Sequence, residues 1–248
     1  MLNFLHILVI GVPPTPLAPR LTPQADTPWA QALQLRDGLA GVALVTLPVF
    51  LQAPWVRLAP VSAALFTVVL VAAGIGLEQR KDAHLRDAGS LLVGFSGSWL
   101  GGCLFWGWCR LHPIWHLPIE AFALPLAIAG LRSRWRLGCA LYLGSLLGTA
   151  ATDGAIALTG LMPLWPQVLA ADPSAAGPLL QEVAQLVLEP GALLVVGAVA
   201  ALLLQICRWI WPQGRAARVA SAALATTLAI DGLFLAAALV APRLSGLI

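Results

Sequence analysis

Three carboxylates lie inside long apolar stretches of this 248-residue chain, at Glu120, Asp153 and Asp231. A charged side chain in hydrocarbon is costly, so such groups usually face the interior of a helix bundle and mark proton or substrate pathways. Asp153 follows Thr149 and Asp231 follows Thr227, each by four residues. On a helix this spacing puts both members of a pair on one face, so we expect each hydroxyl to hydrogen-bond its carboxylate. Such pairs fit a structural role as readily as a proton relay.

Glu120 closes a short motif that also contains Arg110, His112 and His116. The two histidines and the glutamate recur every four residues, which lines them along one face of a regular helix. Three hypotheses follow: a polar network in which Arg110 and the histidines pair with Glu120, axial ligation of a chlorophyll or haem by a neutral His116 imidazole, and a metal site. We favour the network. The metal site ranks last because Pro118 disturbs the helix and a single site needs more ligands.

The composition indicates which elements position these side chains. Hydrophobic residues make up 59% of the chain and charged residues 10%, whereas a soluble domain carries roughly a quarter of its residues as charged ones. So few charges cannot coat a globule of this size. A soluble domain, a disordered chain and a nucleic-acid binder are therefore excluded, and the lipid bilayer is the expected partner. The net charge of +3 needs no anionic partner, because cations at membrane edges account for it.

Seven stretches reach the length of about 20 apolar residues that a helix needs to cross the hydrocarbon core. They are Gly38–Val56, Leu58–Leu77, Ala88–Cys109, Pro113–Leu131, Leu137–Ile156, Gly191–Ile210 and Val219–Val240. Because they are continuously apolar rather than alternating, we expect helices and not barrel strands. The prediction is an all-α, polytopic transmembrane helical bundle of about seven spans, with one domain over residues 37–248. Residues 1–36 are proline-rich and are expected to form a mobile cytoplasmic tail.

The basic residues predict an orientation. Segments on alternate sides of the seven spans carry 11 and 3 Lys and Arg residues, so the positive-inside rule places the N-terminus in the cytoplasm. A helix rises ~1.5 Å per residue, which puts Glu120 about 10 Å below the outer end of its span and Asp153 within about 6 Å of that side. Asp231 lies about 18 Å from the inner end of the last span. All three carboxylates are therefore expected in the outer half of the membrane, where they can converge.

The longest outer loop, residues 162–190, contains no Lys or Arg. Its apolar residues at helical spacing are Leu179, Leu180, Val183, Leu186 and Val187, and the opposite face carries Glu182, Gln185 and Glu189. This pattern predicts an amphipathic helix on the outer membrane face. Such a helix is either a lid that caps the bundle or a docking surface for a partner.

Small residues mark two of the predicted helices as central. The third span contains Gly97-Ser-Trp-Leu-Gly101, and the fifth contains Gly144-Ser-Leu-Leu-Gly148. Lipid removes the hydrophobic drive for helix association, so close packing relies on small faces of this kind. We therefore expect these two helices to lie at the centre of the bundle.

The stretch Phe105-Trp-Gly-Trp-Cys-Arg-Leu-His-Pro-Ile-Trp-His-Leu-Pro-Ile-Glu-Ala-Phe122, set among seven spans, resembles an uncharacterised multi-pass membrane protein family restricted to cyanobacteria. The resemblance covers roughly residues 35–243 and leaves out the proline-rich tail. It carries over no catalytic or binding residues. It implies a photosynthetic cell, a location in the thylakoid or plasma membrane, and an accessory role near photosystems.

The leading functional hypothesis is an integral membrane accessory or assembly factor associated with photosystem subunits, with a pigment such as chlorophyll held by His116. One alternative is a small proton-coupled transporter whose pathway is lined by Glu120, Asp153 and Asp231. The other alternative is an intramembrane enzyme that acts on a lipid, quinone or pigment through His112, His116 and Glu120. The chain contains no P-loop, no H-E-x-x-H, no G-x-S-x-G and no dinucleotide fingerprint, which disfavours an enzyme.

Overall fold

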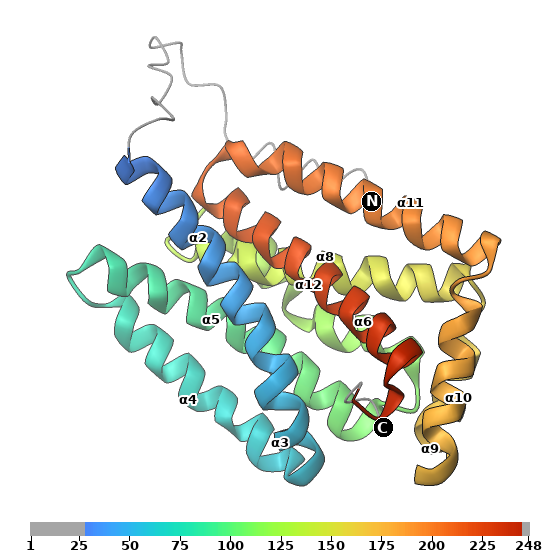
Figure 1. The fold of residues 1–248 in the computed structure, drawn as a ribbon. Helices are drawn as coiled ribbons and strands as arrows, with labels where there is room; N and C mark the ends of the chain where they lie inside the picture. Colours follow the sequence, from blue (N-terminus) through green and yellow to red (C-terminus); the bar gives the residue numbers. More distant parts are fainter. Residues whose placement is uncertain (1–27, 245–248) are drawn as a thin grey trace.

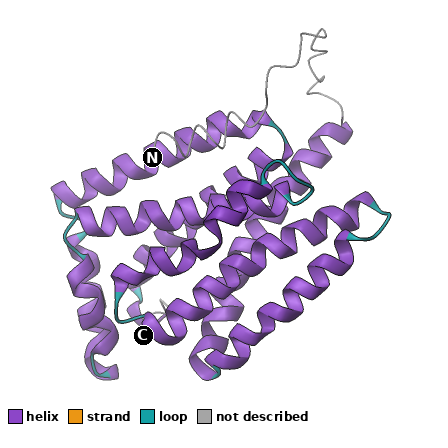
Figure 2. Cartoon of the chain, turned by 180° about the vertical axis from the view of Figure 1, so that it is seen from behind, coloured by secondary structure: helices purple, strands orange, loops and turns teal. Residues whose placement is uncertain are grey.

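The computed structural model describes residues 28–244, and within this range all regular secondary structure is helical (Figures 1 and 2). Seven helical segments are long and apolar enough to cross a membrane: Gln34–Leu58, Pro60–Glu78, Ala83–Cys109, Pro113–Gly130, Arg136–Leu158, Pro190–Gln213 and Arg215–Val240. The all-α bundle of seven spans is thus confirmed, and the chain is an integral, multi-pass membrane protein. Residues 28–36 of the predicted tail belong to the first helix, and residues 1–27 lie outside the described part.

The first three spans form the left part of Figure 1. They consist of α2 (Pro28–Leu47), a π-helical turn (Pro48–Gln52) and α3 (Ala53–Leu58), then α4 (Pro60–Glu78), then α5 (Ala83–Leu104) with a second π-helical turn (Phe105–Cys109). The fourth span is broken into a 3-10 turn (Pro113–Trp115), α6 (His116–Glu120), another 3-10 turn (Ala121–Ala123) and α7 (Leu124–Gly130). Its sequence contains Pro113, Pro118 and Pro125, and proline removes backbone hydrogen bonds from a helix, which explains these breaks.

The remaining spans are α8 (Arg136–Leu158), α11 (Pro190–Ile210) and α12 (Arg215–Val240), with 3-10 turns at Trp211–Gln213 and Pro242–Leu244. Between α8 and α11 lie a 3-10 turn (Met162–Leu164), α9 (Trp165–Ala170) and α10 (Pro173–Leu186). Proline at the first position starts α4, α10 and α11, where its missing N–H costs nothing. Gly160 and Gly214, both with positive φ, follow α8 and precede α12.

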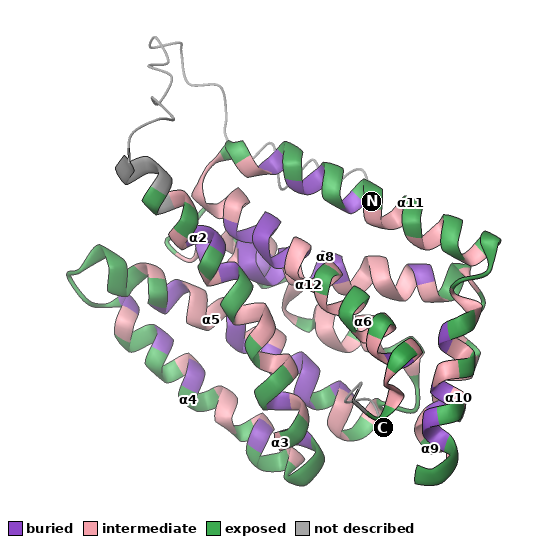
Figure 3. Ribbon diagram, in the orientation of Figure 1, coloured by how far each residue is buried: buried purple, intermediate pink, exposed green. Residues whose placement is uncertain are grey.

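Helices α5 and α8 lie at the centre, as the small-residue pattern predicts. Half of the most apolar 18-residue window is buried in each, against at most 22% in the other five spans. Figure 3 shows the outer helices α4 and α11 with many exposed residues, and these include the large apolar side chains Leu65, Val68 and Leu194. An apolar surface of this kind is unfavourable in water, so we infer that these faces of α4 and α11 contact lipid.

Glycine makes the central contact between α5 and α8 very close. A Cβ built on Gly138 would lie 1.9 Å from the carbonyl oxygen of Ser90, and one built on Gly94 would lie 2.0 Å from the carbonyl oxygen of Gly138. The other side of α8 approaches α12 in the same way, through Gly144 against Ala220 and Gly148 against Thr227. The glycine faces are therefore occupied by contacts within the chain.

The two ends of the bundle differ in charge. We call the end with loops 79–82, 131–135 and 211–214 the basic end, and the opposite end the α10 end. Among the described residues, Arg57, Arg110 and Arg243 are the cations at the α10 end, and all others lie at or near the basic end. At the basic end, buried Asp37 of α2 pairs with Arg215 and Arg218 of α12, each at 3.1 Å. This cluster ties α2 to α12.

Helix α10 lies at the side of the bundle where α8 ends and α11 begins, and it runs transverse to both (Figure 1). Leu180 and Ala184 are buried in a cluster with Val168 and with Ala238 of α12. Glu182 and Gln185 are exposed, so the amphipathic helix predicted from the sequence is confirmed. It ends at Leu186, so Val187 and Glu189 of the predicted pattern lie beyond it. Its apolar face packs on the bundle, which matches the lid rather than an open docking face.

Candidate functional site

His116 occupies the centre of a polar cluster at the start of α6. Its Nε2 lies 3.3 Å from Oε1 of Glu120, one turn later in the same helix. Its Nδ1 lies 3.0 Å from Oδ1 of Asp153 on α8. The ring of Phe105 lies over the imidazole, with 4.2 Å between the ring centroids. The imidazole is thus fixed between two carboxylates and an aromatic ring.

Glu120 is held by both its side chain and its backbone. The hydroxyl of Thr149 on α8 donates to Oε2 at 3.0 Å. The Tyr142 hydroxyl donates to the backbone carbonyl of Glu120 and accepts from the N–H of Ala123 at 3.2 Å. Gly101 of α5 has no side chain, and this absence lets the Glu120 backbone approach: a Cβ there would lie 3.0 Å from the Cα of Glu120. These contacts anchor the broken fourth span against α5 and α8.

Asp231 brings a third spanning helix, α12, to the cluster. The hydroxyl of Thr152 on α8 donates to Oδ2 of Asp231 at 2.6 Å. Asp231 is also close enough to His116, Glu120 and Asp153 to interact with them electrostatically, so it belongs to the same site. The side chains of His116, Glu120 and Asp153 are only 21%, 19% and 16% exposed. We call these four residues, His116, Glu120, Asp153 and Asp231, the acidic cluster.

The structure thus brings together four of the six side chains that the sequence singled out. Arg110 and His112 are exposed, and among the described residues neither pairs with a carboxylate. The reason is local: α6 begins only at His116, and a 3-10 turn precedes it. His112 is therefore not on the same helical face as His116 and Glu120. The backbone carbonyl of Arg110 instead accepts from the indole N–H of Trp165 at 2.9 Å.

Threonine hydroxyls do hydrogen-bond the carboxylates, but not in the pairs that the four-residue spacing predicts. Thr149 donates to Glu120 rather than to Asp153. Thr227 donates to the carbonyl of Ala223 in its own helix at 3.1 Å, and Thr152 takes its place beside Asp231. The sequence pattern did not single out Thr152 or Tyr142 as site residues. The signal that points to Thr152 is its position next to Asp153, on a helix whose small residues admit close neighbours.

The charges of the acidic cluster do not balance when all its groups are ionised. An imidazole donates through both nitrogens only as an imidazolium, and this one positive charge would face three carboxylates. Within residues 28–244, no Lys or Arg forms an ion pair with any of these carboxylates. Uncompensated charge in a low-dielectric region costs several kcal/mol per ion. Protons bound by the carboxyl groups would reduce this net negative charge.

Both ring nitrogens of His116 already face carboxylate oxygens. Axial ligation of a pigment needs a free nitrogen lone pair, so one of these hydrogen bonds would have to break. In the described part of the chain, no group of three or more His, Cys, Asp or Glu side chains is arranged to hold a metal ion. The geometry therefore fits proton binding better than it fits either form of ligation.

These features define a seven-span helical membrane protein with an acidic cluster between three of its spanning segments. The family described as "Protein of unknown function (DUF3120)" matches residues 41–239, so the chain belongs to this family. No curated protein and no solved structure matches the chain.

Proposed function

We propose that the protein is a small proton-coupled transporter in which the acidic cluster binds and releases the coupling protons. The observation that carries this proposal is the position of His116 between Glu120 and Asp153, within the spanning segments. Ionisable side chains at membrane depth are expensive and commonly form proton relays in transporters. A histidine that links two carboxylates from different spans provides such a relay.

The broken fourth span supports the same proposal. Transporters commonly build their ion and substrate sites from discontinuous helices, because the interruption exposes backbone groups to a site within the bundle. Here the interruption contains His116 and Glu120, and short helical pieces flank them on both sides. A broken span can change its path with less loss of hydrogen bonding than a continuous helix. Such a change would alter the distance between His116 and Asp153.

Proton flux in proteoliposomes tests the proposal. The purified chain is reconstituted in vesicles loaded with a pH-sensitive dye, and amino acids, sugars, organic anions and inorganic cations are added outside one at a time. We expect one class of solute to change the internal pH. Glu120→Gln and Asp153→Asn should reduce that rate to the level of protein-free vesicles, because an amide cannot exchange the proton.

Glu182→Gln provides the matched control, since Glu182 is an exposed carboxylate on α10. This variant should transport at the wild-type rate. A solute-driven pH change that persists in Glu120→Gln and Asp153→Asn would contradict the proposal. No response to any class of solute would contradict it as well.

We also propose the finer points of location that follow from the resemblance and the charge pattern. The basic end faces the cytoplasm, and the membrane is a thylakoid or plasma membrane of a cyanobacterium. The excess of Lys and Arg at the basic end supports this orientation.

An accessory role beside photosystem subunits is the second candidate function. Two exposed carboxylates favour it, because Glu182 of α10 and Glu189, which directly precedes α11, are available to a partner. The glycine faces of α5 and α8 do not favour this role, because they already pack against other helices of the same chain. Affinity purification from native membranes should then recover photosystem subunits. Loss of those subunits in a Glu182→Lys/Glu189→Lys variant would support this role, and purification of the chain alone would count against it.

A further inference from the structure

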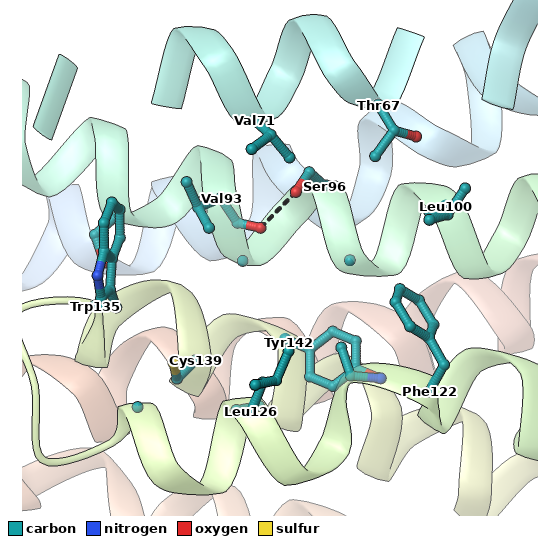
Figure 4. A pocket seen from close by; sticks show the side chains of 16 residues that line it. Thr67, Val71, Val93, Ser96, Leu100, Phe122, Leu126, Trp135, Cys139 and Tyr142 are labelled. Carbon is teal, nitrogen blue, oxygen red and sulfur yellow. Dashed lines mark hydrogen bonds between the residues drawn. The ribbon is translucent and has the colours of Figure 1, made fainter. Parts of the chain in front are cut away.

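A lateral cleft of about 430 Å³ lies between α4, α5, α7 and α8. Figure 4 shows Val71 on one wall, Leu126 and Tyr142 on the other, and Trp135 at one end of the cleft. The cleft contains no residue of the acidic cluster, although Tyr142, which lines the cleft, donates to the backbone carbonyl of Glu120. Its volume falls in the range of roughly 300–1,000 Å³ that is typical of small-molecule sites.

The cleft is long and mostly apolar. On α5 its lining extends from Ser90 to Leu100, which corresponds to about 15 Å along a helix. Gly94, Gly97 and Gly130 contribute no side chains to fill it. Since the walls belong to membrane-spanning helices, the expected occupant is a hydrocarbon chain rather than water.

Several cations are close in sequence to Trp135, which lines one end of this cleft. Arg132 and Arg136 flank Trp135 in the sequence, are exposed, and have no ion-pair partner among the described residues. Arg134 lies over the Trp135 ring and pairs with Glu78 at 3.3 Å. This ion pair joins the 131–135 loop to the end of α4. After Gln79, the chain continues with Arg80 and Lys81. The two segments that meet beside Trp135 thus carry an excess of positive charge.

We propose that this cleft binds one anionic phospholipid, with an acyl chain along α5 and the phosphate beside Arg132 and Arg136. Basic pockets between spanning helices bind anionic headgroups. A neutral lipid would fill the cleft but leave the cations without a partner. Free phosphate would meet the cations but leave the cleft empty. A lipid with an anionic headgroup satisfies both parts of the site, and this inference does not depend on the proposed transport function.

Lipid binding by the purified full-length chain tests the proposal. The protein, in a neutral detergent, is titrated with phosphatidylglycerol or with phosphatidylcholine of the same acyl chains, and native mass spectrometry counts the bound lipids. We expect the first phosphatidylglycerol to bind more tightly than the first phosphatidylcholine. Each cation near a membrane surface is worth about fivefold in affinity for anionic lipid. Arg132→Gln and Arg136→Gln should therefore each weaken phosphatidylglycerol binding about fivefold.

Arg208→Gln is the matched control. Arg208 is also exposed and lies in the last turn of α11, which does not line the cleft. It should bind phosphatidylglycerol as the wild type does. Val71→Phe narrows the cleft from α4 and should weaken the binding of both lipids. Inorganic phosphate at millimolar concentration should not displace the bound lipid.

Equal affinity for the two lipids would overturn the proposal. So would Arg132→Gln and Arg136→Gln variants that bind like Arg208→Gln, or displacement of the lipid by phosphate alone. Loss of the thermal unfolding transition would reveal that Val71→Phe does not fold. In that case the arginine variants alone test the proposal, because the side chains of Arg132 and Arg136 are exposed and make no contact in the core.

Discussion

His116 determines the chemistry of the acidic cluster because it contacts two carboxylates on different helices. Its position depends on where α6 begins, which in turn depends on the prolines of the fourth span. The spacing of His116 and Glu120 made their contact predictable. The contact with Asp153 joins residues 37 apart, and estimates of depth could place both in the same half of the membrane without pairing them.

Thr152→Val tests the bond that links α8 to α12. It removes the hydroxyl that donates to Asp231 and leaves that carboxyl without its donor, which costs about 1–3 kcal/mol. Thermal unfolding in detergent should show a lower midpoint, by about 2–4 °C per kcal/mol for a chain of this size. Thr226→Val is the control, since Thr226 donates to Ala222 within its own helix. Equal midpoints for the two variants would show that the bond to Asp231 contributes nothing.

Asp82 provides a test outside the membrane-spanning segments. Its Oδ1 accepts from the N–H of His84 at 2.6 Å and of Leu85 at 3.3 Å, which caps α5. These hydrogen bonds lower the pKa of Asp82 from its ordinary value of 3.8. Asp82→Ala should therefore lower the thermal midpoint at neutral pH, whereas Asp82→Asn retains a capping side chain.

The pH dependence of this effect has a definite sign. A carboxyl whose pKa is lower in the folded chain stabilises that chain above the pKa of the unfolded state, and the stabilisation is lost as the pH falls through the folded pKa. The difference in midpoint between wild type and Asp82→Ala should therefore shrink on acidification below about pH 3.9. A difference that grows at acidic pH would contradict the capping role.

At the scale of elements, continuous apolar stretches predicted six of the seven spans as helices to within about five residues. The fourth span was predicted as a region, but not as four short helical pieces. Proline signals a break without specifying which hydrogen bonds replace the lost ones, and here Tyr142 and Gly101 supply the contacts from other helices. For the same reason the lateral cleft could not be predicted, because it arises from the packing of four elements.

Glycine at the α5–α8 contact gives a sharp test of the packing. In Gly138→Ala the new Cβ would lie 1.9 Å from a backbone oxygen of Ser90, so the helices must separate. Overpacking of this kind typically costs about 1–3 kcal/mol, and thermal unfolding should register the loss. Gly154→Ala, on the same helix, meets nothing within 4 Å. It should leave the stability unchanged or raise it by up to about 1 kcal/mol, and similar losses in both variants would argue against the close contact.

At the scale of the whole molecule, seven spans put the start of the first span and the end of the last one on opposite sides of the membrane. In cells that carry the chain in the plasma membrane, Arg110→Cys should react with a membrane-impermeant maleimide added outside, because residue 110 is exposed at the α10 end and the proposed orientation turns that end outward. Arg132→Cys, at the basic end, should react only after the membrane is permeabilised. The wild-type chain is the control, because it shows how much labelling comes from the native cysteines. Labelling of both variants from the same side would refute the seven-span topology.

Under the proposed function, side chains from the broken fourth span, α8 and α12 meet within the membrane to hold a proton. Infrared difference spectroscopy of the reconstituted chain measures this directly, through the carbonyl stretch of protonated carboxyl groups during a step in pH. We expect a titrating band that changes in Glu120→Gln and in Asp153→Asn and that persists in Glu182→Gln. A spectrum without such a band, or with a band that both cluster variants leave intact, would contradict proton binding by the cluster.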